Sequence, residues 1–164
     1  MKTLLKTALI VSAFTSIAAS ANISLSDTNS AVFNIGGTVD NLCKVKSNAD
    51  SGASSILIDS TQTLQDIGTL EVWCNTGEST TTTYTSANSG FLVSGANKVA
   101  YTLNVGKLAS DISLNRTYTA KNTAAGSGTE GDTELHALKI KPLSTGLEFA
   151  GQYADTITVT VSYN

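Results

Sequence analysis

The chain ends in the sequence Asp155-Thr-Ile-Thr-Val-Thr-Val-Ser-Tyr-Asn164. Apolar and polar side chains alternate through it, with Ile157, Val159, Val161 and Tyr163 in one phase and threonine or serine in the other. Successive side chains of a β-strand point to opposite faces of the sheet. The pattern therefore predicts a strand with one face buried and one face in solvent.

The same alternation recurs along the chain, between stretches rich in glycine, asparagine and serine. The longest such stretch, Ala124 to Asp132, is expected to be an exposed loop or hairpin. Seven or more short strands separated by such turn-rich stretches predict an all-β sandwich. The other expected strands are Ala31–Val39, Cys43–Lys46, Ser55–Ile58, Thr69–Cys74, Thr80–Thr85, Val99–Val105, Thr117–Ala120 and His136–Lys141.

The start of the chain has the pattern of a cleaved secretory signal. Lys2 and Lys6 precede a mostly apolar stretch, Ala8–Ile17, and Ala19-Ser-Ala21 offers the small residues that a signal peptidase reads. The stretch is shorter than the roughly 20 residues that span a bilayer. We expect residues 1–21 to be removed and the protein to be exported, with a retained membrane anchor as the alternative.

Charge and length narrow the range of partners. Removal of residues 1–21 takes away two of the 10 basic residues and none of the 13 acidic ones, which leaves a net charge of −5. Binding to phosphate needs a basic face, so we expect no nucleic-acid partner. No later segment is apolar enough to predict membrane insertion. The remaining length suits one domain.

The chain has two cysteines, Cys43 and Cys74. In an exported protein such a pair predicts a disulfide bond, which would stabilise the fold by about 3–4 kcal/mol on the chain-entropy model. A metal pair is the competing interpretation, but one histidine, His136, and two cysteines do not make a structural zinc site. We expect no metal and no cofactor.

No arrangement of residues predicts catalysis, and we expect that the protein is not an enzyme. His136 lies in phase with Leu138 and Ile140 in an expected strand, which favours an ordinary hydrogen-bonded histidine over a general base. The carboxylates are scattered along the chain, and a glycosidase pair stays open as an alternative. A carbohydrate-stacking platform stays open, although aromatic residues in a sandwich are more often core residues; its candidates are Trp73, Tyr84, Tyr101, Tyr118 and Tyr153.

Two segments resemble the subunits of chaperone–usher pili. The run Phe33-Asn-Ile-Gly-Gly-Thr-Val-Asp-Asn-Leu-Cys43-Lys-Val45 resembles the alternating N-terminal extension that leads into the first cysteine of these pilins. The ending Ala150-Gly-Gln-Tyr-Ala-Asp-Thr-Ile-Thr-Val-Thr-Val-Ser-Tyr-Asn164 resembles their closing motif. The residues that lead into its strand are similar in sequence to the spore-coat-U/Csu (archaic) branch. The middle of the chain, from about Asn75 to Ser144, resembles no named family.

This resemblance implies an immunoglobulin-like sandwich that lacks its last strand. A periplasmic chaperone lends a strand to such a subunit, and the N-terminal extension of the next subunit then replaces it, a form of strand addition. The resemblance assigns residues 22–41 to the extension and 42–164 to the pilin domain. It gives the donor face to Ala31, Phe33, Ile35, Gly37 and Val39, chaperone recognition at the edge to Ile157, Val159, Val161 and Tyr163, and the family's bridge to Cys43 and Cys74.

The expected function is that of a structural subunit of a cell-surface fimbrium, exported through the periplasm and assembled for adhesion. Its expected partners are a periplasmic chaperone, an outer-membrane usher and neighbouring pilin subunits. In one alternative, residues 31–39 form the first strand of a complete sandwich, and the protein is a self-contained secreted domain that binds carbohydrate or another surface ligand. A secreted hydrolase is the third possibility.

Overall fold

A computed structural model describes residues 26, 30, 32–76, 79–122 and 133–163 of the protein. The chain divides into two units, Met1–Thr38 and Val39–Asn164. All regular structure among the described residues lies in the second unit. The predicted signal peptide, Ala31 and the loop at 124–132 lie outside the described residues.

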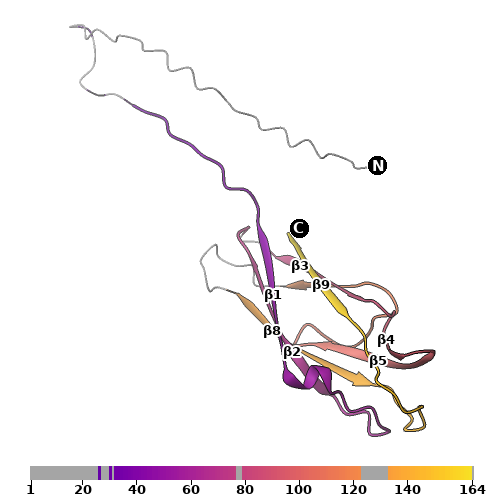
Figure 1. Ribbon diagram of the computed structural model, residues 1–164. Coiled ribbons are helices and arrows are strands. Elements are labelled where there is room, and N and C mark those ends of the chain that lie inside the picture. Colours follow the sequence, from indigo (N-terminus) through magenta and orange to yellow (C-terminus); the bar gives the residue numbers. More distant parts are fainter. Residues whose placement is uncertain (1–25, 27–29, 31, 77–78, 123–132, 164) are drawn as a thin grey trace, which may run out of the picture. The chain divides into compact units, whose positions relative to one another are not determined.

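The second unit is built from two antiparallel sheets (Figure 1), which confirms the predicted all-β class. The larger sheet is curled and has the order β1-β2-β8-β5-β4, with β6 also paired to β5; the smaller has the order β7-β3-β9. The larger sheet comprises β1 (Cys43–Ala49), β2 (Gln65–Cys74), β4 (Phe91–Ser94), β5 (Asn97–Val105), β6 (Ala109–Ser113) and β8 (Glu134–Pro142), and the smaller β3 (Thr80–Ser86), β7 (Tyr118–Asn122) and β9 (Ile157–Tyr163).

The core lies between the inward faces of the two sheets. Burial alternates along the inner strands, as in β2 and β5, because every second side chain faces the interior. The larger sheet contributes most of the apolar side chains, and Tyr84 and Ala120 enter from the smaller sheet. The fully buried large side chains include Leu70, Val72, Tyr84, Tyr101, Leu103, Val105 and Leu114.

The predicted disulfide is confirmed. Cys43 in β1 is bonded to Cys74 in β2, and the two residues are also partners in the antiparallel register of these strands. The bond therefore fastens an edge strand of the larger sheet to its neighbour at the point where the second unit begins.

The prediction of a strand at Ser55–Ile58 is wrong. A short 3-10 helix, η1 (Ser51–Ser54), precedes this segment, and Ile56 and Ile58 pack on the core from outside any strand. The side-chain amide of Gln65 replaces a neighbouring strand, because its Oε1 accepts from the Leu57 N–H and its Nε2 donates to the Leu57 carbonyl, both at 2.7 Å. An apolar alternation thus marks burial here without sheet pairing.

The described residues from 32 to 42 belong to no strand, so the prediction of a strand at Ala31–Val39 is wrong for the residues that the structure describes. Two short strands, β4 and β6, were not predicted. Both are hairpin partners of β5 and have little alternation of their own over four and five residues.

Candidate functional site

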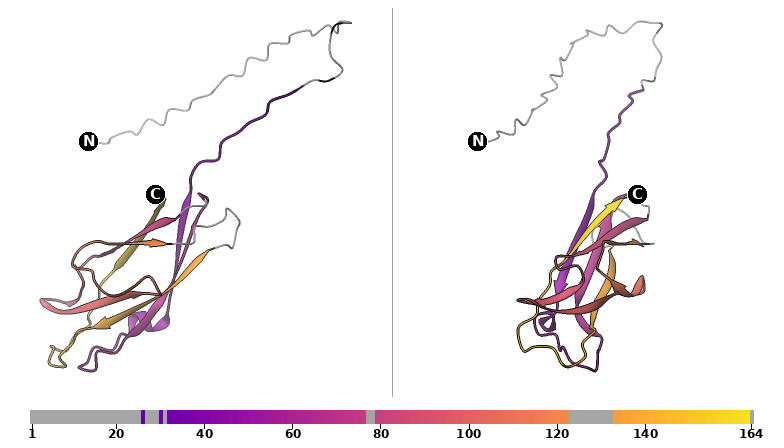
Figure 2. Two further views of the ribbon diagram at one scale, coloured as in Figure 1. Left: turned by 180° about the vertical axis from the view of Figure 1, so that it is seen from behind. Right: turned by 90° about the vertical axis from the view of Figure 1, so that its right-hand side faces the viewer.

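Two edge strands lie side by side without a ladder between them. β1 ends the larger sheet and β9 ends the smaller one, and in Figures 1 and 2 they run next to each other in opposite directions. Among the described residues, each pairs with one neighbour only, β1 with β2 and β9 with β3. Each strand therefore keeps one edge whose backbone groups meet no other strand, an arrangement that invites strand addition.

The interior is incompletely covered along this seam. Leu103 and Val105, in the middle of the larger sheet, are 0% exposed, whereas Val45 on the inward face of β1 is 38% exposed. The inward residues of β9 contact the core cluster but are only partly buried at Ile157, Val159 and Val161. A strip of apolar side chains is thus open to solvent between the two edges.

A groove of about 550 Å³ lies at one end of the seam. Its sides are formed by Ser47–Ala49 of β1 and by Asp155–Ile157 at the start of β9. Its floor is apolar and includes Ile67, Leu92, Tyr101, Leu138 and Ile140. A hollow with an apolar floor and two unpaired strand edges can accept an extended peptide, whose backbone would pair with the edges while alternate side chains enter the core.

The start of β9 is fixed by one carboxylate. Asp155 accepts hydrogen bonds from the Tyr101 hydroxyl at 2.7 Å, the Ser86 hydroxyl at 2.5 Å and the Asn88 N–H at 3.0 Å. Burial, together with the bond to Asp155, raises the pKa of Tyr101 far above its usual range. Tyr101 therefore stays a neutral donor, and the network holds β9 beside β5 and β3.

The segment before Asp155 is also tightly built. Ala154 forms an isolated antiparallel bridge with Val93, and the Tyr153 hydroxyl donates to the Phe149 carbonyl at 2.8 Å. A side chain at Gly151 would collide with Ser94. In the sequence pattern Ala150-Gly-Gln-Tyr-Ala-Asp-Thr, the tyrosine and the aspartate make these hydrogen bonds, and the glycine leaves room for Ser94.

The predicted donor residues are solvent-exposed where the structure describes them. Phe33, Ile35 and Val39 are 86%, 98% and 87% exposed, and a side chain at Gly37 would meet nothing within 4 Å. Exposed apolar side chains that gather into one patch can mark an interaction site. Of the predicted edge residues on β9, Ile157, Val159 and Val161 face the seam, and Tyr163 is 53% exposed.

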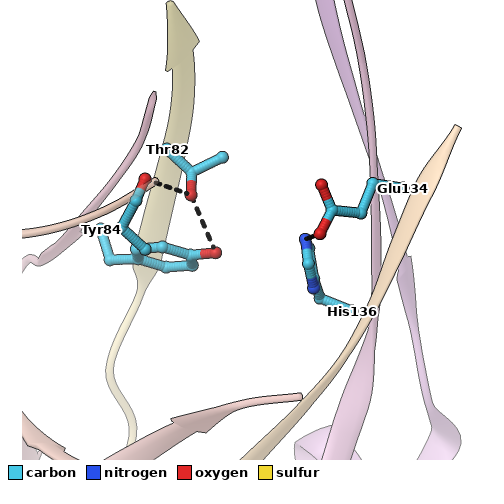
Figure 3. A network of polar contacts seen from close by, with 5 residues as sticks. Thr82, Tyr84, Glu134 and His136 are labelled. Carbon is cyan, nitrogen blue, oxygen red and sulfur yellow. Dashed lines mark hydrogen bonds and ion pairs between the residues drawn. The ribbon is translucent and has the colours of Figure 1, made fainter. Parts of the chain in front are cut away.

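The single histidine lies in a buried polar cluster, shown in Figure 3. His136 is 4% exposed on the inward face of β8, and its Nε2 lies 3.3 Å from Oε1 of Glu134 without the alignment of a hydrogen bond. Across the interior, the Thr82 hydroxyl donates to the Tyr84 hydroxyl at 3.3 Å. Burial raises the pKa of Tyr84.

Within the described ranges, no three His, Cys, Asp or Glu side chains lie close enough to hold a metal ion. No helix in the described part of the chain is long and apolar enough to cross a membrane.

The fold and the groove define a class: a disulfide-bonded all-β protein of two antiparallel sheets with an uncovered seam between two edge strands. No protein-family model matches the chain, and no curated protein sequence matches it. The residues of the groove and of the segment that precedes β1 are therefore the basis for inferring a function.

Proposed function

We propose that the chain is a structural subunit of a cell-surface fimbrium of the chaperone–usher type. In this proposal its domain is an immunoglobulin-like sandwich without its last strand. The segment 31–39 of one copy fills the groove between β1 and β9 of the next copy, and repetition of this step builds a fibre. No covalent chemistry is needed.

The observation that supports the proposal most is the uncovered seam. It has two unpaired edges, one from each sheet, and the side chains between them belong to the core cluster yet remain partly exposed. A strand added along one of these edges would cover this strip. Such an edge in a free subunit is an aggregation hazard, so a periplasmic chaperone that covers it during export, and an usher that exchanges it, are the partners that the proposal requires.

The exposed segment has the length and pattern that the seam needs. β9 has seven residues, which span about 23 Å at roughly 3.3 Å per residue, and residues 33–39 span the same distance. Phe33, Ile35 and Val39 share one face of this segment if it is extended. Their burial would contribute a gross gain of about 5–9 kcal/mol, reduced by the entropy cost of ordering the segment.

Rearrangement of the chain tests the proposal. Residues 22–164 are compared with a version in which residues 29–41 follow Asn164 through a short flexible linker, so that the segment can enter the seam of its own molecule. We expect the rearranged chain to be a monomer that melts far above the native-order chain, with the disulfide intact in both. A matched control carries serine at positions 33, 35 and 39 of the moved segment and should lose the gain.

The opposite result has a clear meaning. If the native-order chain is a stable monomer and the moved segment raises its melting temperature no more than the serine control does, the seam needs no added strand. The chain would then be a self-contained sandwich, and a screen for carbohydrate binding would replace the assembly experiments.

A further inference from the structure

Asn75 binds the backbone that leads into β1. Its Oδ1 accepts a hydrogen bond from the Leu42 N–H at 2.7 Å, and its Nδ2 donates to the Asp40 carbonyl at 2.9 Å. Its own N–H donates to the Leu42 carbonyl at 3.0 Å. Leu42 precedes Cys43 and Asn75 follows Cys74, and the two cysteines are partners in register. These bonds therefore continue the β1–β2 ladder by one position, with the side-chain Oδ1 in the place of the Asn75 carbonyl.

The residues held by Asn75 are those at which the chain would have to turn back on itself. A three-residue loop at 40–42 would place Val39 opposite Cys43, Gly37 opposite Val45 and Ile35 opposite Ser47. Three-residue loops are common in hairpins, and Asp40 and Asn41 are residue types that turns favour. Local sequence alone therefore permits an intrachain hairpin.

This hairpin would bring the apolar face into the chain's own seam. Val45 and Ser47 pair with Val72 and Leu70 of β2, which are buried, so this phase of β1 faces the interior. Residues opposite one another in an antiparallel pair share a face. Phe33, Ile35 and Val39 would therefore face inward, and an extension closed in this way could not be given to a neighbour.

The two arrangements compete for the same atoms. A turn at residues 40–42 takes the Leu42 N–H and the Asp40 carbonyl away from Asn75, which would break both side-chain bonds. We propose that Asn75 is a positioning residue that keeps residues 40–42 in line with β1 and so disfavours closure of the extension on its own domain. This inference rests on the proposed function, because it concerns the choice between intrachain closure and donation to another copy.

The test compares residues 22–164 of the unaltered chain with Asn75→Ala, and with Glu71→Ala as a matched control. Glu71 also makes a side-chain hydrogen bond between β1 and β2, accepted from Asn48 at 3.3 Å, but it lies outside the groove. Each protein is unfolded in guanidinium with its disulfide intact and refolded by dilution at low concentration, where contact between copies is slow. Cleavage by chymotrypsin after Phe33, followed by mass spectrometry, then reports whether the extension is closed.

We expect Asn75→Ala to raise the ratio of protected to accessible Phe33 in the monomer by roughly tenfold, from the loss of two hydrogen bonds. The protection should not depend on protein concentration, and polymer formation on later concentration should slow correspondingly. Glu71→Ala should behave like the unaltered protein. Asn75→Asp keeps the acceptor for Leu42 but not the donor for Asp40, so it should give an intermediate ratio and decides the question if Asn75→Ala does not fold.

Equal accessibility of Phe33 in the folded Asn75 variants and the unaltered protein would overturn the role of Asn75, even if both polymerise. Failure of the unaltered protein to polymerise at any concentration would instead count against the proposed function. In that case the ratio at Phe33 still decides whether Asn75 controls closure. The two failures are therefore distinguishable.

Discussion

The Tyr101 hydroxyl donates a 2.7 Å hydrogen bond to Asp155 and thereby joins the centre of the larger sheet to the start of β9. Tyr101 is 2% exposed and lines the groove floor. Asp155 also receives bonds from Ser86 and Asn88 at the end of β3. One carboxylate thus sets where the edge of the smaller sheet begins relative to the larger sheet, and with it the width of the seam.

Replacement of Asp155 by alanine should lower the free energy of unfolding by about 1–3 kcal/mol, because donors that lie in or near the core lose their acceptor. Tyr101→Phe removes one bond and should cost less. Urea unfolding with the disulfide intact measures both. Asp66→Ala is the control, since this exposed aspartate makes only a surface ion pair with Lys139 at 2.9 Å, worth about 0–1 kcal/mol. Equal effects of Asp155→Ala and Asp66→Ala would contradict the structural role of Asp155.

Gly68 in β2 allows β1 to approach closely at the groove. It has φ +145°, lies at a register shift in the β2–β8 pairing, and a Cβ there would overlap the Asn48 carbonyl oxygen and lie 3.0 Å from the Ala49 Cα. Gly68→Ala should therefore cost at least about 1–3 kcal/mol and weaken amide exchange protection across β1. Gly52→Ala, whose Cβ would make only an ordinary contact with the Asp66 carbonyl, should change little. Equal free energies of unfolding for Gly68→Ala and Gly52→Ala would contradict this role of Gly68.

Glu148 organises the turn at residues 144–148. Its carboxylate accepts from the Ser144 hydroxyl at 2.6 Å and from the N–H groups of Thr145 and Gly146 at 2.7 and 2.9 Å. The Ser144 bond above all, with the Thr145 N–H, lowers the pKa of Glu148 to about 2. A lowered pKa in the folded state stabilises the turn above the ordinary value of 4.5, and this contribution is lost as the pH falls from 4.5 toward 2.

We therefore expect the Glu148 carboxyl carbon to titrate near pH 2 by NMR and the turn to persist at pH 3. Ser144→Ala removes the largest of these interactions and should move the midpoint upward. A midpoint near 4.5 in the unaltered protein would show that the turn does not form in solution.

Sequence alone predicted the fold class because alternation reports which faces are buried. The strands around Val72, Leu103, Ile140 and Val159 were all recognisable in this way. A single pair of cysteines behind an expected export signal was enough to predict the disulfide. The same signal failed at Ile56 and Ile58, where two isoleucines alternate onto the core but the backbone is satisfied by the Gln65 side chain.

The candidate groove could not be predicted from the periodicity of the sequence. Its walls come from β1 and β9, which are more than 100 residues apart in the sequence, and the open seam depends on which strands end each sheet. The Asn75 contacts to Asp40 and Leu42 were equally hidden, because Asn75-Thr-Gly77 has only the composition of an ordinary turn.

A substitution at Gly37 separates an effect on assembly from an effect on the folding of the domain. A side chain at Gly37 or at Gly36 would meet nothing within 4 Å in the single chain, so arginine at either position should leave the thermal unfolding of the isolated domain unchanged. In an extended segment Gly37 lies in phase with Phe33 and Ile35, whereas Gly36 lies in the opposite phase.

If residues 31–39 enter the seam of a neighbour, Gly37→Arg would place a charged side chain in the apolar interior, and Gly36→Arg would point to solvent. We expect Gly37→Arg to abolish polymer formation, measured by light scattering and electron microscopy of concentrated protein, and Gly36→Arg to leave most of it intact. Loss of polymers in both variants would indicate a general effect of added charge, and polymers in both would exclude this face as the donor face. The reverse pattern would mean that the segment binds one residue out of the proposed register, since a one-residue shift exchanges the two faces.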